Sequence, residues 1–507
     1  MSENRTKNSI KNVGTGILNQ GVIFILGFIS RTIFIRTLGT DYLGINGLFS
    51  DVISMLSMAD LGFSSAMAFS FYKPIAENNI VKIAALVNFY RKIYHRIACA
   101  VTILGICVIP FLKYIVNTEE EIPYLTIYYL FSLGNVVVSY LYVYKTAIIT
   151  ADQKNYVLNN ISIYTGIIKT IIQIFALLLY KNYILYLSIG ILFNFLNNFW
   201  ASRKAEELYP FLNEKSKLEK EEKTKIYNNI KSVFIYKISG VLLNATDNTL
   251  ISILINTTMV GYYSNYLMIS NKITSLIQIV FTGVTASVGN IVAKESAQKK
   301  YETFKCLQSI SCIFCGIIVT CFCLLINDLI YVWLGSEFQL DNLVVISITL
   351  NIYMACILQP LWSYREATGM YIRTRYVMLV AAIINLVLSI ILGKMIGLAG
   401  IIFASSISRL LTYCWYEPKI LFREYFNEPL RKYITPIIIN FIIVVICILA
   451  GTVFFMKMKV ITWGMLIIKG VLVCGIVGMV FTVLYSRTEG FIIIYNKLQT
   501  LREKYSR

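Results

Sequence analysis

The sequence predicts an all-helical polytopic membrane protein, and three observations lead to this prediction. First, 57% of the 507 residues are hydrophobic and 14% are charged, whereas a soluble chain carries about 25% charged residues. Second, apolar stretches of about 20 residues, the length of a membrane-spanning helix, recur from one end to the other. Third, no stretch shows the alternating pattern of membrane β-strands. A soluble enzyme, a secreted disulfide scaffold and a disordered chain are therefore excluded.

Fourteen stretches are candidate spans, because each is long enough at about 1.5 Å per residue to cross a hydrocarbon core of about 30 Å. Their approximate bounds are 13–38, 42–70, 96–116, 123–149, 156–180, 183–201, 231–256, 261–286, 305–326, 341–364, 375–393, 397–417, 434–456 and 461–485. Basic residues precede the first stretch without a small-residue cleavage site, so we expect this span to be retained.

The charge distribution predicts the orientation. The chain has 46 Lys and Arg residues against 27 Asp and Glu residues, giving a net charge of +19. In a membrane protein this excess is explained by the positive-inside rule, and no nucleic-acid partner is needed. With the N-terminus in the cytoplasm, most basic residues fall in cytoplasmic segments, while outside turns such as Glu119–Glu121 are acidic or neutral. We therefore expect a cell-membrane protein with both termini cytoplasmic.

The longest polar segment predicts how the spans are grouped. Residues 203–230 mix lysines with glutamates and have the composition of a solvated cytoplasmic linker. The predicted organisation is an N-terminal six-helix lobe at 1–202, this linker, a second six-helix lobe at 231–424, and two extra spans with a basic cytoplasmic tail at 425–507.

A short internal repeat supports two related lobes. The pattern Thr-x-x-aliphatic-Gly occurs at Thr40–Gly44, between spans one and two, and again at Thr257–Gly261, between spans seven and eight. Both copies have the same predicted topology. Together with the layout of six and six spans, this predicts parallel lobes related by a pseudo-twofold axis along the membrane normal, which is a transporter architecture.

Ionisable side chains inside the spans are candidates for function, because they are costly in lipid. Arg31 lies in the outer part of span one, while Lys237 and Lys469 lie close enough to span ends to extend towards an interface. Five more lie nearer the middle of their spans: Asp51, Lys169, Asp247, Lys272 and Arg409.

Helical spacing places many of these charges on polar stripes, because residues three or four apart share a face. The stripes are Gln20, Gly27 and Arg31; Gly47, Asp51 and Ser54 with Asp60 farther inward; Lys237, Asn244, Asp247 and Asn248; Asn265 and Lys272; and Ser405, Ser408 and Arg409. Interhelical hydrogen bonding without a cavity is one interpretation. Matching stripes in both repeats favour the other, a hydrated cavity between the lobes.

Several kinds of site are excluded or disfavoured. There is no phosphate-binding loop motif, so the chain does not itself bind ATP in that manner. His95 is the only histidine, which excludes multi-histidine metal sites. Cys312 and Cys315 are predicted to be packed or lipid-facing thiols, and no metal or cofactor is expected. Pro360 is predicted to kink span ten.

Several short motifs make the sequence resemble the Wzx-type oligosaccharide flippases. This polysaccharide transporter family belongs to the multidrug/oligosaccharidyl-lipid/polysaccharide exporter superfamily, which also holds multidrug and toxin extrusion transporters and lipid II flippases. The motifs are Ser9–Asn12, Arg31 with Arg36, Leu38–Gly44, Ala59–Phe63, Lys237–Gly240 and Asn244–Asn248. The layout is similar over the whole chain, and fourteen spans fit this family better than the twelve of most drug exporters.

The resemblance implies alternating access, with spans one, two, seven and eight lining a cationic cavity. A polyprenyl diphosphate-linked oligosaccharide would pass from the inner to the outer leaflet for capsule, exopolysaccharide or teichoic acid assembly. Membrane lipids, a polysaccharide polymerase and glycosyltransferases are the other expected partners. The substrate-binding candidates are Arg31, Lys272, Arg409, Asn244, Asn248 and Gln20, and the candidates for ion coupling or charge pairing are Asp51, Asp60 and Asp247. Arginine suits the diphosphate, because its guanidinium binds paired oxygens.

Two alternatives stay open at this stage. An ion-coupled multidrug exporter would need carboxylates for cationic drugs, and Asp51 and Asp247 are available for that role. A polysaccharide polymerase is less favoured, because the longest outside segment, 327–341, is too short to build a catalytic site. We therefore expect that the chain is not an enzyme. Its energy source and its sugars are not indicated by the sequence.

Overall fold

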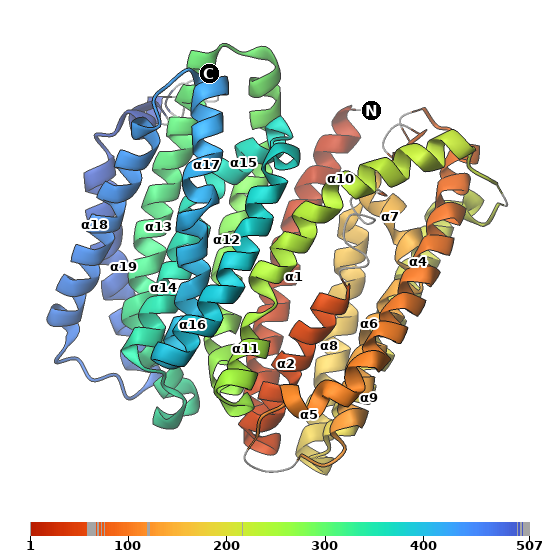
Figure 1. The fold of residues 1–507 in the computed structure, drawn as a ribbon, viewed down its shortest axis with the longest axis horizontal. Coiled ribbons are helices and arrows are strands. Elements are labelled where there is room, and N and C mark those ends of the chain that lie inside the picture. The colour runs from red at the N-terminus through yellow and green to blue at the C-terminus, as the bar shows by residue number, and fades with distance from the viewer. Residues whose placement is uncertain are drawn as a thin grey trace. The chain divides into compact units, whose positions relative to one another are not determined.

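The chain is helical throughout its described part and forms two compact units (Figure 1). The computed structural model describes residues 2–499, apart from 58–66, 68–69, 72–73, 76, 119–121, 215, 494 and 497–498. Contacts divide the chain into residues 1–261 and residues 262–507, which we call the first and the second unit. The predicted all-helical polytopic fold is confirmed.

The first unit holds helices that follow the predicted spans one to seven. They are α1 (Ser2–Leu38), α2 (Thr40–Leu56), α4 (Ile80–Val108), η2 (Ile109–Phe111), α5 (Leu112–Ile115), α6 (Leu125–Tyr140), α7 (Val143–Ala151), α8 (Asn155–Tyr180), α9 (Tyr183–Leu208), η3 (Pro210–Asn213), α10 (Lys220–Asn244) and α11 (Asp247–Leu254). Helix α12 (Thr257–Lys294) begins in this unit. Contacts thus group 231–261 with the first unit, and the predicted four-part organisation stays a prediction.

The second unit holds the remaining spans. Its helices after α12 are α13 (Ala297–Leu334), η4 (Ser336–Phe338), α14 (Asn342–Ile357), α15 (Gln359–Thr368), α16 (Tyr371–Leu411), α17 (Tyr413–Leu421), η5 (Phe422–Phe426), α18 (Arg431–Phe455) and α19 (Trp463–Tyr485). Helix α16 contains the predicted span eleven and most of span twelve, which join at a kink where Gly397 has a φ of +61°. Glycine tolerates this backbone conformation because it has no Cβ.

All fourteen predicted spans coincide with helices, at least over their described residues. By length and hydropathy alone, eight of the described helices can cross a membrane, or ten when each of two bent pairs counts as one span. Pro360 lies at the start of α15, where α14 and α15 bend by 42°, so the predicted kink is confirmed. The predicted fourth span consists of α6 and α7, and these two helices bend by 51° relative to each other.

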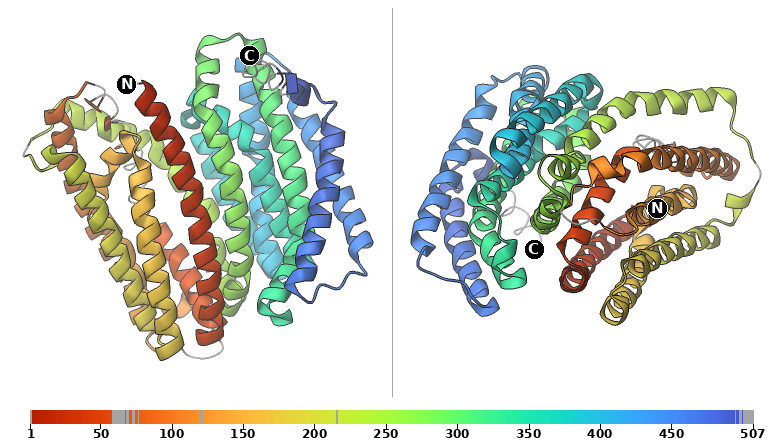
Figure 2. Two further views of the ribbon diagram at one scale, coloured as in Figure 1. Left: turned by 180° about the vertical axis from the view of Figure 1, so that it is seen from behind. Right: turned by 60° about the horizontal axis from the view of Figure 1, so that its bottom comes forward.

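Helices in the first unit are joined by polar contacts as well as apolar packing. Helix α1 lies along α8, which packs on α9, and α9 on α6 (Figure 2). The Asn12 side chain donates to the Gln153 carbonyl at 2.8 Å and accepts from the Tyr156 amide at 2.8 Å. It therefore satisfies an amide in the first turn of α8, which the helix itself leaves unpaired. One residue of the opening motif thus has a structural role.

Helix α13 is the centre of the second unit and contacts α14, α18 and α19 (Figure 2). A Cβ on Gly316 would overlap the ring of Phe481, so this glycine permits α13 and α19 to approach closely. Asn440 of α18 donates to the Cys312 carbonyl at 3.1 Å and to the Tyr485 hydroxyl at 2.7 Å. Cys312 and Cys315 are buried, so the prediction of packed thiols is confirmed.

The two copies of the internal repeat lie in contact, and both are within the first unit. A Cβ on Gly44 would overlap the Thr257 carbonyl oxygen, and a Cβ on Gly261 would lie 2.5 Å from the Thr40 carbonyl oxygen. The Thr258 hydroxyl donates to Asp41 Oδ1 at 2.6 Å. Each motif thus presents its glycine to the other's threonine, and we call this arrangement the repeat contact.

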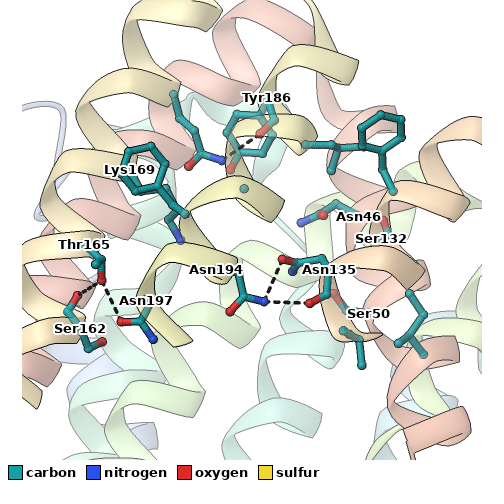
Figure 3. A pocket seen from close by; sticks show the side chains of 18 of the residues that line it. Asn46, Ser50, Ser132, Asn135, Ser162, Thr165, Lys169, Tyr186, Asn194 and Asn197 are labelled. Atoms are coloured by element: carbon teal, nitrogen blue, oxygen red, sulfur yellow. Dashed lines mark hydrogen bonds between the residues drawn. The ribbon is translucent and has the colours of Figure 1, made fainter. Parts of the chain in front are cut away.

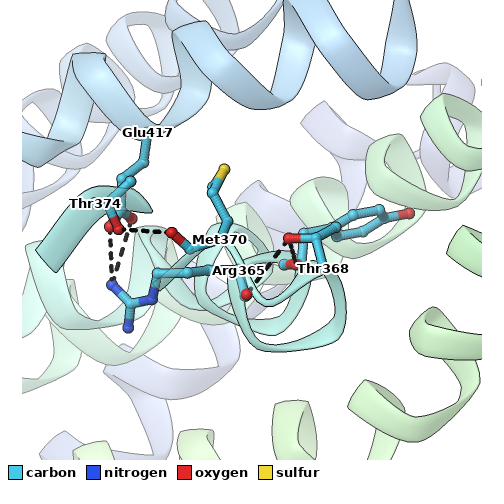
Figure 4. Close-up of polar contacts among 6 residues, drawn as sticks. Arg365, Thr368, Met370, Thr374 and Glu417 are labelled. Atoms are coloured by element: carbon cyan, nitrogen blue, oxygen red, sulfur yellow. Dashed lines mark hydrogen bonds and ion pairs between the residues drawn. The ribbon is translucent and has the colours of Figure 1, made fainter. Parts of the chain in front are cut away.

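A buried ion pair joins α15 to α17 (Figure 4). Arg365 Nη1 donates to both oxygens of Glu417, at 3.2 and 3.3 Å. The side chains are 6% and 0% exposed. Such a pair gains little net stability over apolar packing, but its two members depend on each other, because either one alone would be a buried uncompensated charge.

We therefore expect Glu417→Gln to destabilise the protein by about 3–5 kcal/mol, because Arg365 loses its counter-charge. The double variant Arg365→Met/Glu417→Leu should recover most of this loss. Thermal unfolding of the purified proteins in detergent measures both effects. An unchanged melting temperature for Glu417→Gln would contradict the assigned pairing.

Candidate functional site

The first unit contains a polar cavity of about 810 Å³ that is partly open (Figure 3). Its walls come mainly from α2, α6, α8 and α9, with Ile23 of α1 at one side. The lining is rich in side-chain amides and hydroxyls, which are Asn46, Ser50, Ser54, Ser57, Ser132, Asn135, Tyr140, Ser162, Thr165, Gln173, Tyr186, Asn194 and Asn197. We call this space the amide cavity.

Helical periodicity explains why these residues meet. On α8, Ser162, Thr165, Lys169 and Gln173 follow one another at intervals of three or four and therefore lie on one face. The same spacing holds on α9 for Tyr186, Gly190, Asn194 and Asn197, and on α2 for Asn46, Ser50 and Ser54. Three helices thus turn polar faces to a common interior, and α6 adds Ser132 and Asn135.

Hydrogen bonds between helices hold several of these side chains in place. Asn194 Nδ2 donates to the carbonyl of Asn135 at 2.8 Å and to its Oδ1 at 3.0 Å. Thr165 donates to Asn197 Oδ1 at 2.9 Å, and Gln173 Nε2 donates to the Tyr186 carbonyl at 3.0 Å. The wall is therefore a preformed array of donors and acceptors.

Lys169 is the one charged residue among those that line the amide cavity in the described part of the chain. It is half-buried, and Figure 3 shows its amine directed into the cavity. Lys469, by contrast, pairs with Asp328 at 2.6 Å, and its predicted extension towards an interface stays a prediction. Two lysines inside predicted spans therefore have different environments.

Arg31 and Gln20 lie half-buried on α1. Arg31 interacts electrostatically with Tyr186, which is a lining residue of the amide cavity. This places the arginine beside the cavity. Its predicted role in substrate binding, like that of Gln20, stays a prediction.

Asp51 and Ser54 were predicted on one stripe, but they face different neighbours. Ser54 lines the amide cavity, whereas Asp51 Oδ2 accepts the backbone N–H of Asn248 at 3.3 Å. Asn248 is buried and Asp247, half-buried, opens α11. Asp51 thus satisfies an amide in the first turn of α11, where a negative charge is favourable.

The other predicted site residues lie elsewhere. Lys272 and Arg409 belong to the second unit, where each is half-buried, and their predicted role in substrate binding stays a prediction. Asn244 ends α10, and Asp60 lies outside the described residues. Ser405 accepts from Asn385 at 3.0 Å, and Ser408 donates to the Ser405 carbonyl at 3.0 Å. These two serines therefore form local hydrogen bonds.

The asparagines and serines of the amide cavity are absent from the predicted site residues. Among the lining residues, Lys169 stands out in the sequence because charges are rare in spans, and Ser54 lies on a predicted polar stripe. The available signal was the regular spacing of neutral polar residues on spans five and six. Such residues also join helices without forming a cavity, so their spacing alone does not identify a site.

No protein-family model and no curated protein matches this chain. Among solved structures, it is similar to the lipid II flippase MurJ in an inward closed conformation, with a TM-score of 0.68 and 13% identity over 94% of this chain and 99% of that one. It is also similar to a multidrug resistance MATE family transporter of the MOP superfamily. The inward-facing conformation gives a TM-score of 0.53 and 13% identity, covering 78% of this chain and 94% of the transporter.

The outward-facing MATE conformation also gives a TM-score of 0.53 and 13% identity, covering 88% of this chain and 97% of the transporter. At these identities the likeness shows a shared fold.

Proposed function

We propose that this chain, which shares its fold with a lipid II flippase and with multidrug transporters, flips lipid-linked oligosaccharides across the cell membrane by alternating access. The cargo is a polyprenyl diphosphate-linked repeat unit destined for a surface polysaccharide. The observation on which the proposal rests is the amide cavity in the first unit. Its lining suits a sugar better than a hydrophobic drug.

The chemistry of the wall supports a carbohydrate ligand. Each sugar hydroxyl both donates and accepts hydrogen bonds, and asparagine, glutamine and serine side chains do the same. Asn194, Asn135 and Gln173 are already fixed by bonds to neighbouring helices. The volume of about 810 Å³ lies within the usual range of small-molecule sites, about 300–1,000 Å³.

The remaining parts of the cargo have separate requirements. The diphosphate is anionic, and we assign its binding to Arg31, an arginine of the first unit that lies beside the amide cavity. The polyprenyl chain is apolar and can remain in lipid. Glycosyltransferases would act before this step, on the cytoplasmic side of the membrane. A polysaccharide polymerase would act after it, on the outer side.

Export of cationic drugs is the competing function, and the described contacts give it less support. A cationic drug would favour a carboxylate in the cavity, but the lining residues that the structure describes include none. Asp51 instead receives the N–H of Asn248. The energy source is not assigned, since the chain shows no ATP-binding motif and Asp51, Asp60 and Asp247 remain candidates for ion coupling.

Leaflet-resolved detection of lipid-linked repeat units in a depletion strain tests the proposal. On depletion, we expect these units to accumulate in the inner leaflet and disappear from the outer one, and re-expression should reverse this. An organic-cation efflux assay in the same strain serves as the comparison. Normal outer-leaflet repeat units together with lost cation efflux would replace this proposal with drug export.

A further inference from the structure

We propose that the amide cavity is a subsite for a sugar that carries one negative charge, and that Lys169 binds this charge. The charged group is a carboxylate or a phosphodiester on the glycan, as distinct from the lipid diphosphate. This inference rests on the proposed function and specifies its substrate class: an acidic repeat unit.

The first observation in support is that Lys169 has no acidic partner among the described residues. A charge inside a membrane span is costly unless it has a partner, a hydrated cavity or a ligand. Two other lysines within predicted spans have acidic partners: Lys145 pairs with Glu206, and Lys469 with Asp328. Among the described residues, no hydrogen bond or ion pair to Lys169 occurs and no carboxylate lines its cavity.

The surroundings of the amine indicate a sugar. Lys169 lies one helical turn from Thr165 and one from Gln173, both on the same face of α8. Asn194 and Asn197 contribute amides from α9 to the same cavity (Figure 3). A ligand that bonds to all these groups has one anionic oxygen group for the ammonium and several hydroxyls for the amides.

Charge balance distinguishes the sugar from the lipid diphosphate. One ammonium neutralises one negative charge, which matches a uronate carboxylate or a phosphodiester. A diphosphate carries more than one charge and is best bound by planar guanidinium groups. The lining residues that the structure describes include no arginine, so the diphosphate is better placed outside the amide cavity.

Binding to the purified full-length protein in lipid nanodiscs tests this proposal. The probes are cellobiouronic acid, a glucose bearing a methyl phosphodiester, neutral cellobiose and inorganic diphosphate. We expect one or both singly charged sugars to bind at least about tenfold more tightly than cellobiose, as one charge-assisted hydrogen bond allows. Lys169→Met should remove this preference and leave cellobiose binding unchanged.

Two further variants are controls. Lys169→Arg should retain the preference, because the charge persists. Lys394→Met removes an exposed lysine of the second unit and should change nothing. Thermal unfolding of each variant separates lost binding from lost folding, and if Lys169→Met does not fold, Lys169→Gln takes its place.

Three results would overturn the subsite. These are equal binding of charged and neutral sugars to the wild type, an unchanged preference in folded Lys169→Met, and a Lys169-dependent site that takes diphosphate but neither charged sugar. The binding measurement needs no transport. If the repeat units reach the outer leaflet without this protein, the proposed function fails even though a charged-sugar site is found, so the two failures are distinguishable.

Discussion

Arg31→Ala is expected to abolish export of the surface polymer while the protein remains in the membrane at normal abundance. Arg31 is half-buried on α1 and lies beside a lining residue of the amide cavity, where a bound diphosphate would meet it. Arg31→Lys should retain part of the export, because an ammonium keeps the charge but loses the planar arrangement of donors. Quantifying exported polymer against membrane protein level measures both outcomes.

A structural ion pair is the competing explanation for Arg31, with Asp51 or Asp247 as its partner. In that case Arg31→Ala should lower abundance, and Arg31→Ala/Asp51→Ala or Arg31→Ala/Asp247→Ala should restore it. The Asp51 carboxylate already accepts the N–H of Asn248. Replacing Asp51 with alanine therefore leaves a backbone amide of α11 without this hydrogen bond, and we expect no rescue from the Arg31→Ala/Asp51→Ala variant. Normal export by well-folded Arg31→Ala protein would exclude both roles.

Gly44→Ala is expected to reduce export severely, because the added methyl group would overlap the Thr257 carbonyl oxygen. A backbone carbonyl cannot move out of the way by a side-chain rotation, so the two motifs of the repeat contact must move apart. Forced overlap of this kind typically costs about 1–3 kcal/mol. Gly261→Ala should act in the same way from the other side, with its Cβ 2.5 Å from the Thr40 carbonyl oxygen. Polymer export relative to membrane abundance is the measurement.

Gly21→Ala is the matched control for this prediction. Gly21 is also helical, and a Cβ there would have no atom within 4 Å, so its replacement should leave export unchanged. A cross-link is a second test of the repeat contact. The Asp41→Cys/Thr258→Cys variant should form a disulfide that blocks export until the disulfide is reduced. Full export by Gly44→Ala, or by the oxidised double-cysteine variant, would show that the repeat contact need not form or open during transport.

The spans were predictable from the sequence because a helix in lipid needs a long apolar stretch, and this requirement is local. Pro360 was equally informative, since a proline inside a span removes a backbone hydrogen bond and bends the helix. Gly397 gave no such signal, and the kink within α16 depends on a backbone conformation that only the structure displays.

The charged residues of the candidate site were predictable from the sequence, whereas the neutral polar residues that line it were not. Arg31 and Lys169 stand out because ionisable residues are rare in spans, whereas Asn135 and Asn194 are the kind of residue that joins helices in any bundle. Asp51 illustrates a further limit. Its spacing grouped it with Ser54, but a helix has several polar faces, and α2 directs Ser54 into the amide cavity and Asp51 towards α11.

The repeat contact has a consequence for the ancestry of the chain. Asp41 and Thr258 occupy the same position in the two motifs, 217 residues apart, and they are bonded to each other. A contact between equivalent positions is isologous, as at the twofold axis of a homodimer. In a dimer of identical chains this position would meet its own copy, so an aspartate there would oppose a second aspartate and be repelled. Joining both copies in one polypeptide removes that constraint, because one partner can become a donor while the other remains an acceptor.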